Sequence, residues 1–139
     1  MMSGETRVRV GGDEEVVVAR QHGRTLATEL GLSRTEATLV ATAISEVARN
    51  IVQYAGQGEI VLDAVNSSGR VGVRVVARDT GPGIHRVDWA LAGEDPSGGR
   101  VRLGLPGARR LMDEFRIESE VGKGTTVTMI KWKGGWRKK

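Results

Sequence analysis

Glu46 and Asn50 lie four residues apart in the stretch ISEVARNIVQYAG, residues 44–56. Residues i and i+4 project from one face of an α-helix, so the carboxylate and the carboxamide would lie side by side, next to the apolar stripe. A carboxylate can take a proton as a general base, and a carboxamide oxygen suits a magnesium ion that keeps most of its waters. The alternative is a solvated helix edge, which is the more common meaning of such a pair taken alone.

Asp79 begins a second polar stretch, DTGPGIH. Counting by twos from Val71 along the preceding strand places its carboxylate on the face that the strand otherwise fills with apolar side chains. A half-buried carboxylate needs a hydrogen-bond donor, and an amine on a purine ring would supply one. Gly81 and Gly83 carry no side chains, which permits the close approach of a flat ligand. The alternative is a glycine–proline turn capped by an Asx interaction, which is favoured for a lone D-x-G-x-G motif.

Two further glycine-containing motifs follow. In RLGLPGARRLMDEF, Gly104 and Gly107 stand at the start of a predicted helix, whose free amides and positive dipole end suit phosphate oxygens. The alternative is a loop-to-helix entry with Pro106 in the first turn, which needs no ligand. The stretch GKGTTV is a turn that leads into Thr125 and is, by itself, an ordinary hairpin turn. The order and separation of the four motifs are more specific than any one of them.

Hydrophobic periodicity predicts the elements that position these residues. Ser33 and Glu36 have the spacing of a capping box, and apolar residues recur at helical intervals from Ala37 to Ala55. Gly31 and Gly56 are placed to end helices. The expected elements are strands over residues 7–10 and 15–20, helices over 19–31 and 33–55, a hairpin of strands over 59–65 and 70–79, a helix over 105–113, and strands over 115–120 and 125–132. Helices gather early and strands late, which predicts an α+β fold: a two-layer α/β sandwich with helices on one face of a mixed, largely antiparallel sheet.

Composition restricts the function classes. A chain of 139 residues, 39% of them hydrophobic, supports one core, and no linker divides it, so we expect one domain over residues 1–139. The absence of cysteine excludes disulfides and thiolate metal sites, and two histidines are too few for a dedicated zinc site. Any metal must then be held by oxygen. The start of the chain lacks the apolar segment of a signal peptide, and no run of about 18 apolar residues occurs, so we expect a cytoplasmic protein without membrane contact.

The formal net charge of +4 comes from the C-terminal end. Five basic residues lie in residues 131–139, namely Lys131, Lys133, Arg137, Lys138 and Lys139. The rest of the chain carries about −1, so we expect a solvated basic tail over residues 131–139 rather than a nucleic-acid surface. The alternative is a tail in which Trp132 and Trp136 stack on bases. Only five aromatic residues occur in the chain, which disfavours nucleic-acid binding.

The series of Glu-x-x-x-Asn, D-x-G-x-G, a glycine-opened helix and G-x-G-T resembles the GHKL ATP-binding superfamily, which includes DNA gyrase, large heat-shock chaperones and histidine kinases. Within it, EVARNIVQYAG, DTGPGI, GLPGARRLMDEF and VGKGTTVTMIKW resemble the small serine/threonine switch kinases of anti-sigma pathways in the bacterial stressosome. The similarity spans about Arg7 to Trp132. It implies the histidine-kinase-like ATPase fold, with ATP and Mg²⁺ as cofactors.

The resemblance also implies a role for each residue of the series. These roles are general base for Glu46, magnesium ligand for Asn50, acceptor from the adenine amine for Asp79, floor of the base and ribose for Gly81 and Gly83, approach to the phosphates for Gly104, and support of the adenine side for Thr125. Gly107 is also included among the predicted ATP-binding residues. One departure concerns SGGRVRLG, where the relatives usually keep glycines just before the position of Gly104. Arg100 and Arg102 would stiffen the expected ATP lid or bring cations toward the phosphates, and we include Arg102 among the predicted ATP-binding residues.

The resemblance implies a protein kinase that transfers the γ-phosphate of Mg·ATP to a serine or threonine of STAS-domain partners, the RsbR-like scaffold and RsbS-like antagonist of the stressosome. A second partner, such as a metal-dependent phosphatase or another output enzyme, would follow in the switch. The alternative is a nucleotide-gated anti-sigma-type binding module with little catalysis. Glu46 favours the kinase, because a dedicated binder needs no base beside the metal ligand.

Overall fold

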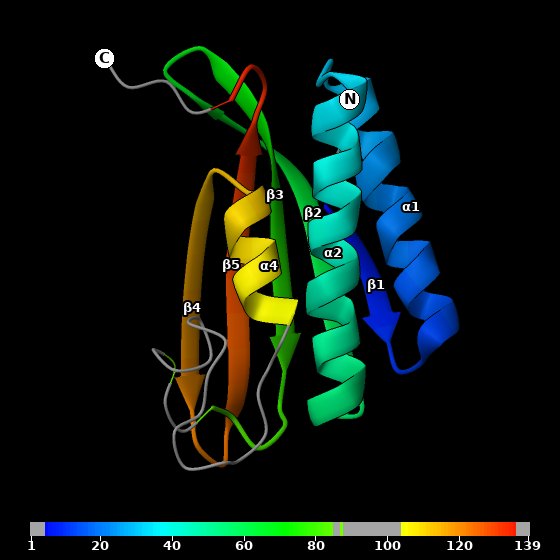
Figure 1. Cartoon of the computed structure of the whole chain (residues 1–139), viewed down its shortest axis with the longest axis vertical. Helices are drawn as coiled ribbons and strands as arrows, with labels where there is room; N and C mark the ends of the chain where they lie inside the picture. Colours follow the sequence, from blue (N-terminus) through cyan, green and yellow to red (C-terminus); the bar gives the residue numbers. More distant parts are fainter. Residues whose placement is uncertain (1–4, 85–86, 88–103, 136–139) are drawn as a thin grey trace.

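The computed structural model describes residues 5–84, 87 and 104–135 of the chain. These residues form one antiparallel sheet and three helices (Figure 1). The elements are β1 (Thr6–Val10), α1 (Asp13–Glu29), α2 (Arg34–Tyr54), β2 (Gly58–Ser67), β3 (Arg70–Asp79), α4 (Gly104–Leu111), β4 (Glu114–Glu120) and β5 (Gly124–Trp132). The predicted α+β class is confirmed, and only one predicted element has the wrong type.

The five strands are ordered β1-β2-β3-β5-β4, and each neighbouring pair is antiparallel. The sheet was expected to be mixed, and no parallel pair occurs among the described strands. All three helices cover the same face, with α2 between α1 and α4 (Figure 1). The core lies between this face and the helices, and none of the described helices lies on the other sheet face. The predicted two-layer arrangement is therefore confirmed.

The predicted strand over residues 15–20 is wrong, because this segment is the first part of α1. Its run of valines favoured a strand, but Val16 and Ala19 are buried at a helical interval, which Gly23 and Ala27 continue. Packing of this stripe on α2 outweighs the local preference of β-branched residues. A Cβ at Gly23 would lie 2.1 Å from Cδ1 of Ile44, so glycine allows the two helices to approach closely.

The long helix α2 begins and ends as predicted. Ser33 Oγ accepts a hydrogen bond from the Glu36 backbone at 3.0 Å, and Glu36 Oε1 accepts one from the Ser33 backbone at 2.8 Å, which completes the capping box. At the other end, Gly56 follows the helix with a φ of 88°. The helix is fixed at both ends and buried along one face, so it holds Glu46 and Asn50 in defined places.

The hairpin of β2 and β3 confirms the predicted turn. Ser67 pairs with Arg70, and both Ser68 and Gly69 between them have positive φ values, as a type I′ turn requires. This register places Val73, Val75 and Ala77 under the helices, where at most 3% of each is exposed. Asp79 continues the same alternation and therefore faces the helical layer at the end of β3.

The C-terminal end corrects the expected basic tail. Lys131 is 8% exposed, and its Nζ lies 3.4 Å from Oδ1 of Asp113. Trp132 is 5% exposed, and its ring nitrogen donates to Oε2 of Glu114 at 2.6 Å. These side chains belong to the fold, so Trp132 is not available to stack on a base. Residues 136–139, with Trp136, lie outside the described part of the chain. None of the described helices is both long and apolar enough to cross a membrane.

Candidate functional site

Asn50 is a buried polar side chain for which the described residues provide no partner. It is 6% exposed, and its carboxamide makes no hydrogen bond to any residue that the structure describes. A carboxamide placed in this way can bind a ligand from outside the core, since nothing in the described protein competes for it.

Glu46 lies one helical turn before Asn50, against the start of α4. Its side chain is 33% exposed, and its Oε2 lies 3.3 Å from Nη1 of Arg49. A Cβ at Gly104 would lie 3.0 Å from Oε1 of Glu46 and 3.1 Å from its backbone oxygen. The structure therefore brings the predicted base and the predicted phosphate-approaching glycine together. A Cβ at Gly107 would meet no described atom within 4 Å, so packing alone does not require glycine there.

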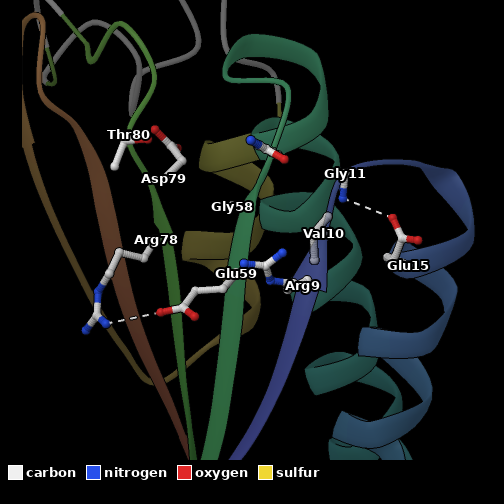
Figure 2. A pocket seen from close by; sticks show the side chains of 10 residues that line it. Arg9, Val10, Gly11, Glu15, Gly58, Glu59, Arg78, Asp79 and Thr80 are labelled. Atoms are coloured by element: carbon white, nitrogen blue, oxygen red, sulfur yellow. Dashed lines mark hydrogen bonds and ion pairs between the residues drawn. The ribbon is translucent and has the colours of Figure 1, made fainter.

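Asp79 uses its two carboxylate oxygens differently. Oδ1 accepts a hydrogen bond from the Gly81 backbone at 2.9 Å, which is the Asx interaction that the sequence left open as an alternative. Oδ2 makes no hydrogen bond to any described residue. The Asp79 side chain can thus stabilise the turn through Oδ1 and accept a hydrogen bond from a ligand through Oδ2. Figure 2 shows Asp79 and Thr80 where β3 ends.

Gly81 and Gly83 fit closely against the protein itself. A Cβ at Gly81 would lie 2.5 Å from Cβ of Ala55, and one at Gly83, where φ is 81°, would lie 2.4 Å from the backbone oxygen of Glu120. The sequence interpretation assigned these glycines to the approach of a flat ligand. The structure gives a different physical reason for them: they allow the loop to pack on α2 and on the β4–β5 turn. A role as the floor of the base remains a prediction.

Thr125 is 3% exposed and lies next to Asp79 across the β3–β5 pairing. Sequence reasoning missed Ser119, which lies on the other side of Thr125 in β4. Its Oγ is 2.9 Å from Oγ1 of Thr125 and accepts from the Ile84 backbone at 2.7 Å. Pairing the strands back from the VGKG turn could have placed it there. Asp79, Ser119 and Thr125 all line a hollow of about 280 Å³ at this end of the sheet.

A groove of about 490 Å³ lies between α1 and α2, and Glu46 is one of the residues that line it. Arg20, Arg24 and Arg49 line it together with Glu46. Three guanidinium groups and one carboxylate make the groove positive overall. A groove of this charge attracts acidic groups.

Another pocket, of about 480 Å³, lies at the ends of β1, β2 and β3 (Figure 2). It shares Asp79 with the predicted site but contains neither Glu46 nor Asn50. Polar groups in it pair with each other: Glu15 accepts from the Gly11 backbone at 3.0 Å, and Arg78 lies 3.4 Å from Glu59. It does not bring the predicted site residues together.

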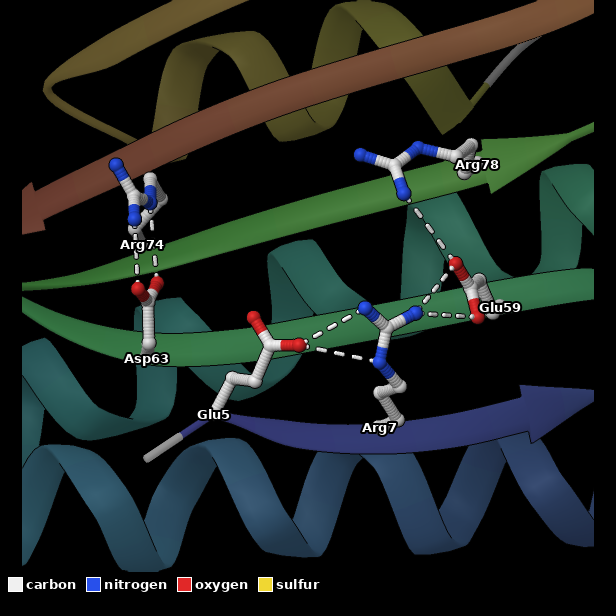
Figure 3. Close-up of polar contacts among 6 residues, drawn as sticks. All are labelled: Glu5, Arg7, Glu59, Asp63, Arg74 and Arg78. Carbon is white, nitrogen blue, oxygen red and sulfur yellow. Dashed lines mark hydrogen bonds and ion pairs between the residues drawn. The ribbon is translucent and has the colours of Figure 1, made fainter. Parts of the chain in front are cut away.

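The open face of the sheet carries ion pairs (Figure 3). Arg74 donates to both carboxylate oxygens of Asp63, at 3.0 and 2.6 Å, and this hydrogen bonding raises the pKa of Arg74 above its ordinary value. Arg7 lies 2.8 Å from Glu5 and 3.1 Å from Glu59, and hydrogen bonds to Glu5 first and Glu59 second raise the pKa of Arg7. These charges neutralise each other across neighbouring strands.

The described residues contain no group of three or more histidine, aspartate or glutamate side chains placed to hold a metal ion. A magnesium ion at Asn50 would therefore take most of its ligands from phosphate oxygens and water, as this ion commonly does. The carboxamide of Asn50, which bonds to none of the residues that the structure describes, fits that arrangement. Arg102, predicted to reach the phosphates, lies outside the described residues.

Comparison with known proteins gives a family match over most of the chain. The model of the histidine kinase-like ATPase domain matches residues 12–131. The serine/threonine-protein kinase RsbT of Bacillus subtilis is 41% identical over 131 residues, which are 94% of this chain and 98% of the kinase. An anti-sigma F factor of Geobacillus thermodenitrificans is 34% identical over 103 residues, which are 69% of each chain.

A solved structure shares the fold. The RsbU and RsbW domains of a Mycobacterium tuberculosis protein superimpose with a TM-score of 0.61 at 19% identity. The match covers 93% of this chain and 32% of that one. At this identity the likeness concerns the fold alone, and it agrees with the observed layers of helix and sheet.

Proposed function

Because this chain belongs to the histidine kinase-like ATPase domain family and is similar to a serine/threonine-protein kinase along 94% of its length, we propose that it is an ATP-dependent protein serine/threonine kinase. The observation that carries the proposal is Asn50, whose carboxamide is nearly buried and has no partner among the described residues. Burying a polar group without a hydrogen bond costs free energy. A bound nucleotide and its metal would compensate that cost.

The nucleotide would lie along the helix-facing side of the sheet, from the end of β3 to the start of α4. Oδ2 of Asp79 would accept from the adenine amine, since Oδ1 is used by Gly81. The first amides of α4 would face the phosphates, because a helix N-terminus favours negative charge. Gly104 allows that helix start to lie against Glu46, so the transferred phosphoryl group would lie within reach of the base.

Glu46 would take the proton of the acceptor hydroxyl. Magnesium, held by Asn50, phosphate oxygens and water, would neutralise charge on the transferred group. The acceptor would enter through the groove of Arg20, Arg24 and Arg49. Arg49, whose guanidinium lies 3.3 Å from Glu46, would hold the carboxylate at the edge of this groove. Positioning of the two reactants by this chain would supply most of the remaining rate enhancement.

We further propose that the acceptors are STAS-domain proteins, of the RsbR-like scaffold and RsbS-like antagonist kinds, in a partner-switching stress pathway. Similarity to RsbT along nearly the whole chain supports this choice. After phosphorylation the kinase would leave its substrate and engage a second partner, such as a metal-dependent phosphatase. The positive groove beside Glu46 would favour acceptor segments with acidic residues.

The test is Glu46→Gln, assayed for both ATP binding and phosphate transfer to a purified STAS-domain partner. Transfer should fall by at least ~100-fold, the usual effect of removing a general base. The dissociation constant for Mg·ATP should stay within about threefold, because glutamine keeps the shape of the glutamate side chain. Glu29→Gln is a matched control, because Glu29 is exposed and does not line the groove. Undiminished transfer by the Glu46→Gln variant would contradict the assigned role.

Similarity to an anti-sigma F factor supports a second candidate, a nucleotide-gated binding module that sequesters a partner. The same experiment separates the two candidates. A binding module would retain an ATP-dependent complex with its partner and show no phosphate transfer in the unaltered protein. A kinase would transfer phosphate before Glu46 is changed and lose that transfer afterwards.

A further inference from the structure

Ser119 occupies the end of a row of side chains that three strands present toward the helices. The register pairs Asp79 of β3 with Thr125 of β5, and Thr125 with Ser119 of β4. The row lies beneath the loop that carries Ile84, whose backbone nitrogen donates to Ser119 Oγ at 2.7 Å. Ser119 is thus the residue through which this loop and Thr125 contact each other.

The hydrogen-bonding capacity of Ser119 fixes the direction of its contacts. A serine hydroxyl donates one hydrogen and accepts through two lone pairs. One lone pair accepts the hydrogen bond from the Ile84 backbone amide. Oγ of Ser119 also lies 3.1 Å from the Gly124 carbonyl oxygen and 2.9 Å from Oγ1 of Thr125. A carbonyl oxygen only accepts, so all three contacts are satisfied together when Ser119 donates to Gly124 and accepts from Thr125. The hydrogen of Thr125 is then directed at Ser119.

Thr125 therefore offers only lone pairs to a ligand. Beside it, Oδ2 of Asp79 is also an acceptor and has no partner among the described residues. Two neighbouring acceptors suit a group that donates two hydrogens, such as the exocyclic amine of adenine. A carbonyl oxygen at the same ring position would face acceptors and no donor, which is strongly unfavourable in a buried site.

We propose that Ser119 is a positioning residue for nucleotide selection: by holding the Thr125 hydroxyl as an acceptor, it makes the site prefer a 6-amino purine to a 6-oxo purine. This inference rests on the proposed nucleotide function of the same site. It assigns Ser119 no contact with the nucleotide. Its effect reaches the base through Thr125.

The experiment compares the binding of ATP and inosine triphosphate, each with Mg²⁺, by calorimetric titration or by competition. These nucleotides differ only at the purine edge that Thr125 and Asp79 would face. The unaltered chain should prefer ATP. In Ser119→Ala the Thr125 hydroxyl is free to turn and donate to the 6-oxo group, so the preference should fall by about three- to tenfold, the worth of one hydrogen bond.

Ser119→Thr is the conservative variant, and it should keep the preference within about twofold because it keeps the hydroxyl. Loss of the hydrogen bond to Ile84 in Ser119→Ala would loosen the loop and weaken the binding of both nucleotides equally. The ratio of the two dissociation constants does not respond to such a loosening, so it separates hydroxyl orientation from a merely structural role.

Thr125→Val supplies a second test that does not depend on the folding of Ser119→Ala. This variant removes the Thr125 hydroxyl, so the preference for ATP over inosine triphosphate should fall by a similar factor. In the double variant with Ser119→Ala, the ratio of the two dissociation constants should change no further. An unchanged ratio in Ser119→Ala or in Thr125→Val, with both nucleotides still bound, would overturn this proposal alone. An unaltered chain that binds neither nucleotide would overturn the proposed function, and this inference with it.

Discussion

The predicted site on the helix-facing side of the sheet differs from the open face in how its polar side chains are paired. On the open face, guanidinium and carboxylate groups pair with each other, as Arg74 and Asp63 do at 2.6 Å (Figure 3). On the helix-facing side, the Asn50 carboxamide and Oδ2 of Asp79 have no partner among the described residues. Exposed pairs add little to stability, whereas a partner-free buried group is costly. From this contrast we expect the ligand on the helix-facing side, at the end of β3.

The largest expected effect is that of Asn50→Ala on nucleotide binding. Mg·ATP affinity should fall by at least ~100-fold, about 2.8 kcal/mol, because the variant removes a proposed metal ligand. The free energy of unfolding should stay the same or rise, since no described partner is lost and a carboxamide buried without one is costly. Calorimetric titration and urea denaturation measure the two effects. Asn66→Ala, at the exposed end of β2, is the matched control, and equal ATP affinity in both variants would contradict the contrast between the two faces.

A second prediction concerns the loop after β3, and it compares two glycines with nearly equal φ values, 81° at Gly83 and 83° at Gly122. A Cβ at Gly83 would lie 2.4 Å from the Glu120 oxygen, whereas one at Gly122 would meet no described atom within 4 Å. Gly83→Ala should therefore destabilise by about 2–4 kcal/mol and Gly122→Ala by about 1 kcal/mol, measured by urea denaturation. Equal losses would show that the loop does not pack on the β4–β5 turn as described.

The smallest effect is expected on the open face. Arg74→Ala should lower the free energy of unfolding by no more than about 1 kcal/mol, because the side chain is 42% exposed, and it should leave ATP affinity unchanged. The pKa of Arg74 is raised, so its stabilising charge is present at lower pH and would be lost only as pH rises through that raised value. Added salt is the practical way to weaken the pair. A change in ATP affinity would mean that the two faces are coupled.

The sequence allowed the long helix, the β2–β3 hairpin and the layer arrangement to be predicted, because each depends on local signals. Ser33 with Glu36 begins α2, and Gly56 ends it, through short-range contacts. The first half of α1 could not be predicted in the same way. Its valines favour a strand locally, and helix formation there depends on packing against α2, where Gly23 lies close to Ile44.

The candidate site was predicted only in part for a related reason. Glu46 and Asn50 are neighbours on one helix, so their closeness follows from spacing. Gly104 reaches Glu46 through tertiary packing, and Ser119 reaches Thr125 through the register of β4 and β5. Lys131 illustrates the opposite error: its position in a basic stretch suggested a solvated tail, but Asp113 pairs with it inside the fold.

Asp79→Asn tests the central claim most directly. The asparagine carbonyl oxygen can still accept from the Gly81 backbone, so the turn at the end of β3 is kept, while an amide NH₂ replaces the oxygen without a described partner. Calorimetric titration with Mg·ATP should give one saturable site in the unaltered chain and at least ~30-fold weaker binding in the variant, with an unchanged melting temperature. Binding of equal strength in both proteins, or no heat in the unaltered chain, would contradict the nucleotide site.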